Sequence, residues 1–187
     1  MTSPIARPPS AWALAPVSGL AGLAASAAFM PFNVWPAAFA AVAGLAWTTS
    51  RTGRLRAAVG QGWAFGLAFM ATSLVWQTEI LILSYTALTL TMSLFYAALG
   101  AALYAGRDVA WRPLWGAAAW ATMEWATTVI PFGGFPWMRL GYTQLDSPLA
   151  SFYPLTGAAS VTFLVALVGH LLAALADARP LRPLAAL

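Results

Sequence analysis

Long apolar runs, separated by short polar or proline-containing links, dominate this chain. Six of these runs are long enough to form helices. They cover residues 11–29, 34–49, 57–78, 85–105, 113–130 and 155–176. The link between the first two runs contains Pro31 and Pro36, which predicts a tight reversal of the chain. The pattern therefore predicts an all-α fold.

The composition places this fold in a membrane. Hydrophobic residues make up 61% of the 187 residues and charged residues only 7%, and the mean hydropathy is +0.75. A soluble domain of this composition would lack the polar surface needed to cover itself. Since one crossing takes roughly 20 apolar residues, the length suits about six crossings. We predict a polytopic transmembrane helix bundle that forms one membrane domain over residues 1–187, with no room for a separate soluble domain.

The arginines predict how the bundle is oriented. With six crossings, eight of the nine basic residues fall on one face, and all nine are arginine. The positive-inside rule assigns that face, and with it both termini, to the cytoplasm. The eight are Arg7, Arg51, Arg54, Arg56, Arg107, Arg112, Arg179 and Arg182. Arg139, Glu79 and Asp146 fall on the opposite face.

Both ends of the sequence allow further interpretations. A cleavable signal peptide competes with the first helix, because Ala25-Ser26-Ala27 resembles a small-residue cleavage site. Its removal would leave five spans and destroy the alternation of the arginines. After Asp177 the sequence resembles a cytoplasmic loop followed by the beginning of another apolar run, as expected of a truncated chain.

Several kinds of chemistry are excluded within this sequence. It contains neither Cys nor Lys, so thiol nucleophiles, disulfides and Schiff bases are not available. The single histidine, His170, cannot assemble a metal site alone. The arginines are scattered between apolar runs and form no stripe, which argues against nucleic-acid binding. We expect no catalytic residue, no metal and no cofactor.

The one long polar and aromatic passage, Gly133 to Pro148, is the candidate site. Its aromatic residues and proline fit an interfacial belt, or they form a wall through which lipid enters. Together with an acidic residue in the fifth helix, the candidate lipid- and substrate-contacting residues are Gly134, Phe135, Pro136, Trp137, Arg139, Tyr142, Gln144 and Glu124.

Arg139 is the exception to the orientation rule and needs a partner. Either it pairs with Asp146 or Glu124 as a structural tie, which is preferred, or it holds a phospholipid phosphate. Glu124 lies inside a predicted span, where a carboxylate is costly and usually paired. It is either functional or bonded to Gln77, to Thr127 or to a tryptophan indole.

Two other ionisable groups have simpler interpretations. Glu79 ends the third predicted helix and is expected to be solvated. His170 is expected to form a hydrogen bond across the bundle near the inner leaflet.

The sequence resembles a known family in three places. The first turn reads Ala28-Phe29-Met30-Pro31-Phe32-Asn33-Val34-Trp35-Pro36, and the third helix contains Gly62-Trp63-Ala64-Phe65-Gly66 leading to Trp76. The third place combines Glu124-Trp125 with Gly134-Phe135-Pro136-Trp137, Leu140-Gly141-Tyr142-Thr143-Gln144 and Pro148. These segments resemble the membrane half of bacterial apolipoprotein N-acyltransferase.

The resemblance implies a multi-pass protein of the bacterial plasma membrane that acts in lipoprotein maturation. Such enzymes move an acyl chain from a phospholipid to the amino group of a diacylglyceryl-modified cysteine, so the implied partners are phospholipid and lipoprotein lipid chains. In the family, the chemistry belongs to a nitrilase-like domain with a Glu-Lys-Cys triad. This sequence contains no such domain and neither of the last two residue types. It is therefore expected to bind lipid but to need a separate catalytic domain for transfer.

Two other functions compete with this one. The chain could be a non-catalytic scaffold of the same fold that recruits a separate enzyme, such as a polyprenol-phosphate mannosyltransferase. A small transporter or channel is the third possibility, but the sequence lacks matched acids and broken helices near the middle of the bilayer.

Overall fold

The computed structural model describes residues 13–177, and all regular elements in that range are helical. They are α1 (Ala15–Ala27), α2 (Pro36–Ser50), α3 (Leu55–Ser73), η1 (Val75–Glu79), α4 (Ile82–Ala105), α5 (Arg112–Thr127), η2 (Leu140–Gln144), η3 (Pro148–Phe152) and α6 (Tyr153–Ala176). The three η elements are short 3-10 helices. The predicted all-α fold is confirmed for the described residues.

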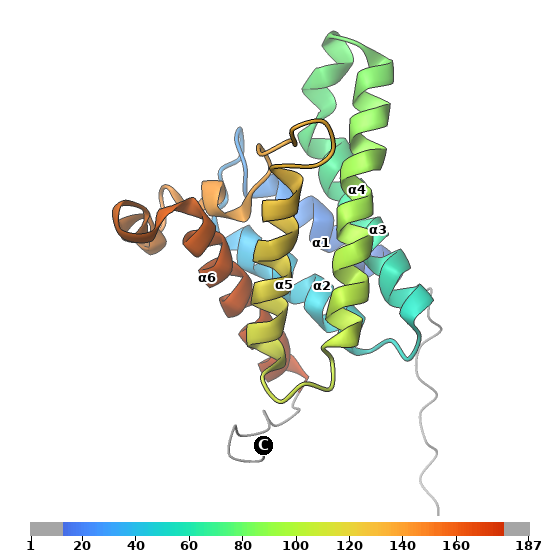
Figure 1. Cartoon of the computed structure of the whole chain (residues 1–187), viewed down its shortest axis with the longest axis vertical. Helices are drawn as coiled ribbons and strands as arrows, with labels where there is room; N and C mark the ends of the chain where they lie inside the picture. Colours follow the sequence, from blue (N-terminus) through green and yellow to red (C-terminus); the bar gives the residue numbers. More distant parts are fainter. Residues whose placement is uncertain (1–12, 178–187) are drawn as a thin grey trace, which may run out of the picture.

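The α-helices run up and down, so that successive links lie at opposite ends of the bundle (Figure 1). At one end Asp177 forms ion pairs with Arg51 (3.2 Å) and Arg112 (3.6 Å), which brings the α2–α3 link, the start of α5 and the end of α6 together. We call it the arginine-rich end, and it carries Arg51, Arg54, Arg56, Arg107 and Arg112.

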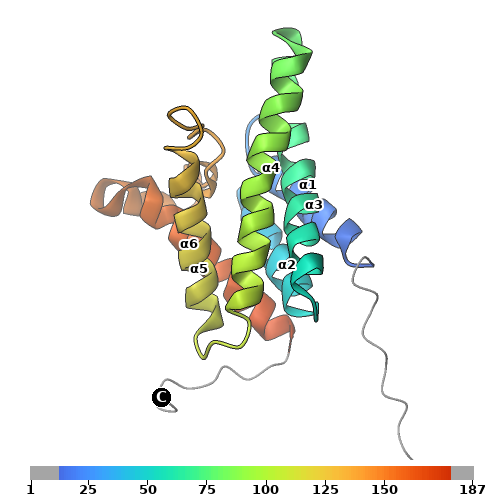
Figure 2. The same ribbon diagram turned by 45° about the vertical axis from the view of Figure 1, so that its right-hand side comes forward.

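The opposite end, called the loop end here, carries residues 28–35, 74–81 and 128–152. There Asn33 Nδ2 donates to Asp146 Oδ2 at 2.5 Å, so the α1–α2 link lies against the segment between α5 and α6. The start of α4 projects beyond the other helices (Figure 2), and η1 lies beside it (Figure 1). The described arginines, apart from Arg139, thus lie at the end opposite the loop end, as the predicted alternation requires. Arg7, Arg179 and Arg182 lie outside the described residues.

Small residues allow the helices to approach closely, as is usual where dispersion drives packing in lipid. A Cβ atom added to Gly62 of α3 would collide with the backbone carbonyl of Tyr96 in α4. A Cβ atom on Gly100 of α4 would collide with the carbonyl of Ala58 in α3. Beside this contact lies an aromatic cluster, in which Tyr96 is 5.3 Å from Phe65 and 6.1 Å from Trp120 between ring centroids.

The tight reversal between α1 and α2 is confirmed. Val34 N donates to the Ala27 carbonyl at 3.0 Å, and Asn33 N donates to the Phe29 carbonyl at 2.9 Å. Pro36 then occupies the first turn of α2, where the missing N–H costs nothing.

The predicted helix ends need correction at several places. The run 57–78 is wrong at its end, because α3 stops at Ser73 and the chain tightens into η1. The run 85–105 begins too late, since α4 already starts at Ile82, and the run 113–130 extends three residues beyond α5. The last helix is interrupted at Gly157, whose φ of 74° is open to glycine but strained for other residues.

By length and apolar character, two of the described helical segments could cross a membrane: Ile82–Ala105 and Pro148–Ala176. Ala15–Ala27 is apolar but shorter. The structure therefore supports an apolar helical bundle compatible with a membrane, while six crossings remain a prediction.

Candidate functional site

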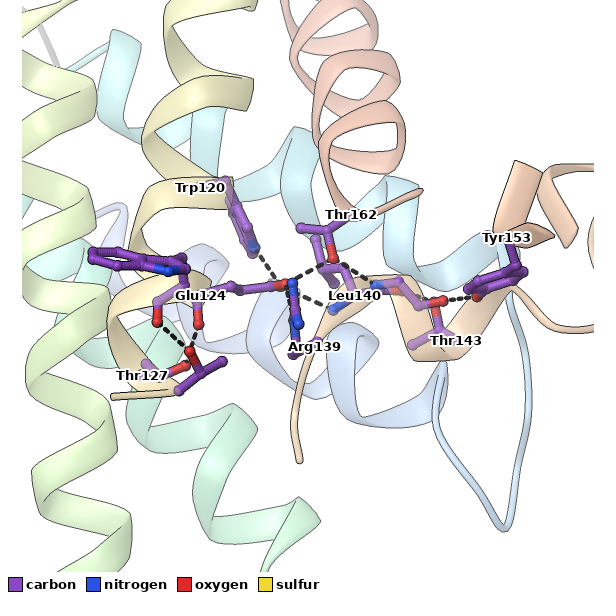
Figure 3. A network of polar contacts seen from close by, with 11 residues as sticks. Trp120, Glu124, Thr127, Arg139, Leu140, Thr143, Tyr153 and Thr162 are labelled. Carbon is purple, nitrogen blue, oxygen red and sulfur yellow. Dashed lines mark hydrogen bonds and ion pairs between the residues drawn. The ribbon is translucent and has the colours of Figure 1, made fainter. Parts of the chain in front are cut away.

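A buried carboxylate organises the loop end. Glu124 lies near the end of α5 and is only 2% exposed. Its Oε1 accepts hydrogen bonds from Leu140 N (2.8 Å) and from Trp120 Nε1 (3.1 Å). Its Oε2 accepts a hydrogen bond from Thr162 Oγ1 at 2.8 Å (Figure 3). One side chain thus joins α5, η2 and α6.

Arg139 completes this cluster. Its Nε lies 3.6 Å from Glu124 Oε2, an ion-pair separation longer than a hydrogen bond, and the side chain is only 16% exposed. The predicted structural tie is therefore present, and its partner is Glu124 and not Asp146. Since the carboxylate already faces four donor groups, we interpret it as a structural anchor and not as a free base.

A second set of bonds fixes the residues after Arg139. Gly141 N donates to Thr162 Oγ1 at 2.9 Å, and the Tyr153 hydroxyl donates to the Gly141 carbonyl. Gln144 is fully buried, and its Nε2 donates to Thr143 Oγ1 (2.7 Å) and to the Trp35 carbonyl (3.2 Å). The segment between α5 and α6 is consequently held on α6 and on the α1–α2 link.

The aromatic part of the site faces outward. The rings of Trp137 and Trp76 are stacked, with centroids 5.6 Å apart and an interplanar angle of 17°. Phe135 lies 5.3 Å from Trp137, and its backbone N donates to the Thr127 carbonyl at 2.6 Å. Trp76 is 40% exposed and Trp137 is 54% exposed. We call Trp76, Phe135 and Trp137 the aromatic rim.

Backbone geometry explains the glycines that precede the rim. Gly133 and Gly134 both have positive φ angles, of 93° and 86°. A Cβ atom on Gly134 would also collide with the backbone carbonyl of Thr128, so this turn tolerates no side chain there. Pro136, which separates Phe135 from Trp137 in the sequence, is exposed.

The structure divides the predicted site residues into two groups. Glu124, Arg139 and Gln144 lie in the polar cluster, whereas Phe135 and Trp137 form the rim. Tyr142 is 42% exposed, and its ring lies 5.8 Å from the Arg139 guanidinium carbon. Contact of any of these residues with lipid remains a prediction.

Some predicted partners of Glu124 are wrong. Gln77 does not reach it and instead accepts a hydrogen bond from Ser84 Oγ at 3.3 Å. Thr127 Oγ1 donates to the main-chain carbonyl of Glu124 at 2.7 Å and not to the carboxylate. A tryptophan indole does bond to the carboxylate, but it is that of Trp120 in the same helix. The expected helix-to-helix bond comes from Thr162 of α6 instead.

Sequence reasoning missed Thr162 and left Trp76 out of the site. Thr162 lies within an apolar helix, where one threonine gives no signal of its own. The sequence predicts an interfacial anchor at Trp76 and includes it in the family resemblance. Its stacking on Trp137 was missed because the two residues lie far apart along the chain.

The prediction for Glu79 is confirmed, whereas the prediction for His170 is not. Glu79 is exposed, as expected, although it ends η1 and not α3. The expected cross-bundle hydrogen bond of His170 is not seen: its Nε2 is buried without a partner among the described residues. Within residues 13–177 no cluster of three or more acidic or histidine side chains could hold a metal ion.

A small cavity lies behind the rim, between α3, α4 and α5. Its volume is about 10 Å³, and its lining includes Tyr96, Glu124, Phe135 and Met138. That is room for about one water molecule. A substrate chain therefore cannot enter here unless the rim moves, and the exposed surface of the rim is the accessible part of the site.

Comparison with known proteins identifies relatives of most of the described bundle. The family model for the apolipoprotein N-acyltransferase N-terminal domain matches residues 21–171. An apolipoprotein N-acyltransferase from Coxiella burnetii is 31% identical over 166 residues, covering 80% of this chain and 33% of that protein. The one from Ralstonia nicotianae is 31% identical over 181 residues, covering 88% of this chain and 34% of that protein.

A third relative, from Haemophilus ducreyi, is 33% identical over 156 residues, which is 78% of this chain and 30% of that protein. The chain thus spans about a third of the length of these curated relatives. The matches favour the acyltransferase interpretation over the scaffold and transporter interpretations.

Proposed function

The chain belongs to the apolipoprotein N-acyltransferase family, whose amino-terminal domain it matches, and we propose that it provides the membrane part of such an enzyme. It forms one membrane domain over residues 1–187 that crosses the bacterial plasma membrane six times, with both ends in the cytoplasm. The arginine-rich end supports this orientation through the positive-inside rule, and the loop end then faces the outer surface.

The proposed task of the loop end is to admit lipid. A phospholipid donor and a lipid-modified protein both keep their tails in the bilayer, so they must reach the enzyme sideways near the outer interface. Tryptophan rings favour that depth. The candidate contacts are the rim residues together with Gly134, Pro136, Arg139, Tyr142 and Gln144.

The observation that carries this proposal is that the exposed rim is built on a rigid support. An interfacial belt needs only amphipathic rings at the right depth. Here the rim continues directly into Arg139 and Leu140, which are bound to the buried Glu124 carboxylate. Such an arrangement holds the stacked rings in a fixed position, as a substrate wall requires and a belt does not.

Acyl transfer itself is assigned to groups outside this sequence. A thioester intermediate needs a thiolate, and the sequence contains no cysteine. We propose that a nitrilase-like domain supplies the catalytic groups, while this chain binds phospholipid and the lipid chains of the lipoprotein.

The experiment joins this chain to the nitrilase-like domain of a relative in a strain depleted of its own N-acyltransferase. Lipoprotein N-acylation is then measured for the unaltered chain, for Trp137→Ala and for Trp125→Ala. Trp125 is the matched control, since it is 62% exposed on α5 and no ring contact is found for it among the described residues.

Trp137→Ala is expected to lower the rate on the order of tenfold, because it removes a lipid-facing aromatic contact worth about 1.5 kcal/mol or more. Trp125→Ala is expected to change the rate less than about twofold. Equal effects of the two substitutions would reduce the rim to an interfacial belt. Acyl transfer by this chain without a catalytic domain would overturn the proposal that a separate nitrilase-like domain supplies the catalytic groups.

A further inference from the structure

A second polar cavity lies at the arginine-rich end, far from the aromatic rim. It has a volume of about 40 Å³ and lies between α2, α4, α5 and α6. Its polar lining includes Thr49, Arg107, Arg112, His170 and Asp177. A space of this size accommodates a few water-sized atoms, such as the oxygens of a phosphate group.

Two donor-capable atoms around this cavity have no partner. Arg112 Nη2 and His170 Nε2 are both buried and make no hydrogen bond to the described residues. His170 is only 7% exposed, and its ring packs on Gly116 of α5. Buried polar atoms are nearly always bonded, so the two residues that line this cavity can each take a polar partner from outside the chain.

The charges around the cavity favour an anion. Asp177 pairs with both Arg51 and Arg112, and it also accepts a hydrogen bond from Ser50 Oγ at 2.8 Å. Arg107 pairs with Asp108, whose side chain is 82% exposed and therefore neutralises it weakly. The cavity lining itself holds two arginines, Arg107 and Arg112, and one aspartate, Asp177, which leaves one positive charge.

An apolar groove lies next to this cavity, on the other side of Trp115. The groove lies between α4 and α5, has a volume of about 410 Å³ and is lined mainly by alanines together with Phe95, Leu99, Trp115 and Met123. Trp115 borders both spaces, and its Nε1 donates to the Ala102 carbonyl at 2.8 Å. From Trp115 to Ala126 the groove follows α5 for about 16 Å at 1.5 Å per residue.

We propose that one phospholipid binds at this place, with its phosphate at Arg112 and His170 and one acyl chain in the groove between α4 and α5. Charge complementarity selects the anionic headgroup, and the apolar groove that borders the cavity at Trp115 selects an attached chain over free phosphate. The phosphate position lies at the opposite end of the bundle from the proposed lipid entrance, and the acyl chain runs along α5 toward the loop end. Its lipid joins α4, α5 and α6 and is not consumed.

The test measures lipid retention by the purified full chain. The chain is prepared in detergent and titrated with phosphatidylglycerol, and the dissociation constant of the tightest lipid is measured by native mass spectrometry. Glycerol 3-phosphate serves as the competitor without acyl chains. The variants are Arg112→Gln for the phosphate site and Ala118→Phe for the groove.

Each variant has a matched control. Arg56→Gln removes an exposed charge at the same end, and Ala105→Phe adds a ring to an exposed position of α4 outside the groove. Because Arg112 also pairs with Asp177, Arg112→Gln removes a structural contact as well. Ala118 is exposed, so Ala118→Phe tests the groove without disturbing the core. Circular dichroism confirms that each variant is folded.

We expect one tightly retained lipid, a loss of affinity on the order of tenfold in both variants, and less than about twofold change in both controls. Equal losses in the controls would show non-specific binding and overturn the proposal. Competition by glycerol 3-phosphate combined with an unaffected Ala118→Phe would indicate an oxyanion site without a lipid chain. Neither outcome bears on the acyl-transfer assay, since lipid retention needs no catalytic domain.

Discussion

Removal of the Glu124 carboxylate should release the loop end from the bundle. Glu124→Ala eliminates three hydrogen bonds, from Leu140 N, Trp120 Nε1 and Thr162 Oγ1, together with the ion pair to Arg139. Hydrogen bonds between membrane helices average about 0.6 kcal/mol. If the bonds from Trp120 in the same helix and from Leu140 in η2 have the same value as the one from Thr162, the three together account for about 2 kcal/mol. Breaking a buried ion pair from one side costs about 3–5 kcal/mol, because the remaining charge is left without a partner.

The broken ion pair has the larger effect and determines the expected loss of free energy of unfolding. Arg139 is 16% exposed, so part of its charge is hydrated after the substitution, and the lower end of the range applies. We therefore expect Glu124→Ala to lower the free energy of unfolding by about 3 kcal/mol. Glu124→Gln keeps one acceptor oxygen and is expected to lose about 1–2 kcal/mol.

Unfolding of the purified chain in mixed micelles, followed by tryptophan fluorescence, measures these losses. Thr127→Val is the matched control, because the Thr127 hydroxyl bonds only within its own helix. Limited trypsin digestion adds a local measurement, since Arg139 is the only basic residue between Arg112 and Arg179. Release of the segment should produce rapid cleavage after Arg139 in Glu124→Ala but not in Thr127→Val.

A double substitution separates charge from hydrogen bonding. Arg139→Gln removes the stranded charge, so the combined variant should be less destabilised than the sum of the single variants by about 1–2 kcal/mol. The reasoning fails if Glu124→Ala unfolds like Thr127→Val, or if the two substitutions at Glu124 and Arg139 are simply additive.

Two further predictions concern the bundle and its orientation. Gly62→Ala places a methyl group against the Tyr96 carbonyl and should destabilise the chain by about 1–3 kcal/mol in thermal unfolding. Gly19→Ala is the control, because Gly19 has open space around it, and it should be neutral or slightly stabilising. Equal effects of the two substitutions would contradict the close α3–α4 contact. Because the sequence is free of cysteine, Arg54→Cys and Glu79→Cys each introduce a single thiol. A membrane-impermeant maleimide should label Glu79→Cys in intact spheroplasts and Arg54→Cys only after the membrane is broken, and the reverse pattern would invert the proposed topology.

Local sequence patterns determined the helical class and the arrangement of the ends. Each apolar run is a property of one segment, and the arginines occur in alternate links, so both features can be read without knowing any contact. The two prolines of the first link likewise fixed a reversal between α1 and α2. The end of α3 escaped prediction because Val75 and Trp76 continue the apolar run without a glycine or proline.

Only the tertiary structure decided which residues meet at the site. The sequence predicted that Glu124 needs a partner, but several candidates met that need equally well. The choice of Trp120, Leu140, Thr162 and Arg139 depends on how α5 and α6 face each other and on where the intervening segment folds back. The stacking of Trp76 on Trp137, and the union of Arg112 and His170 around one cavity, have the same physical origin: helix packing brings together side chains whose separation along the chain carries no signal.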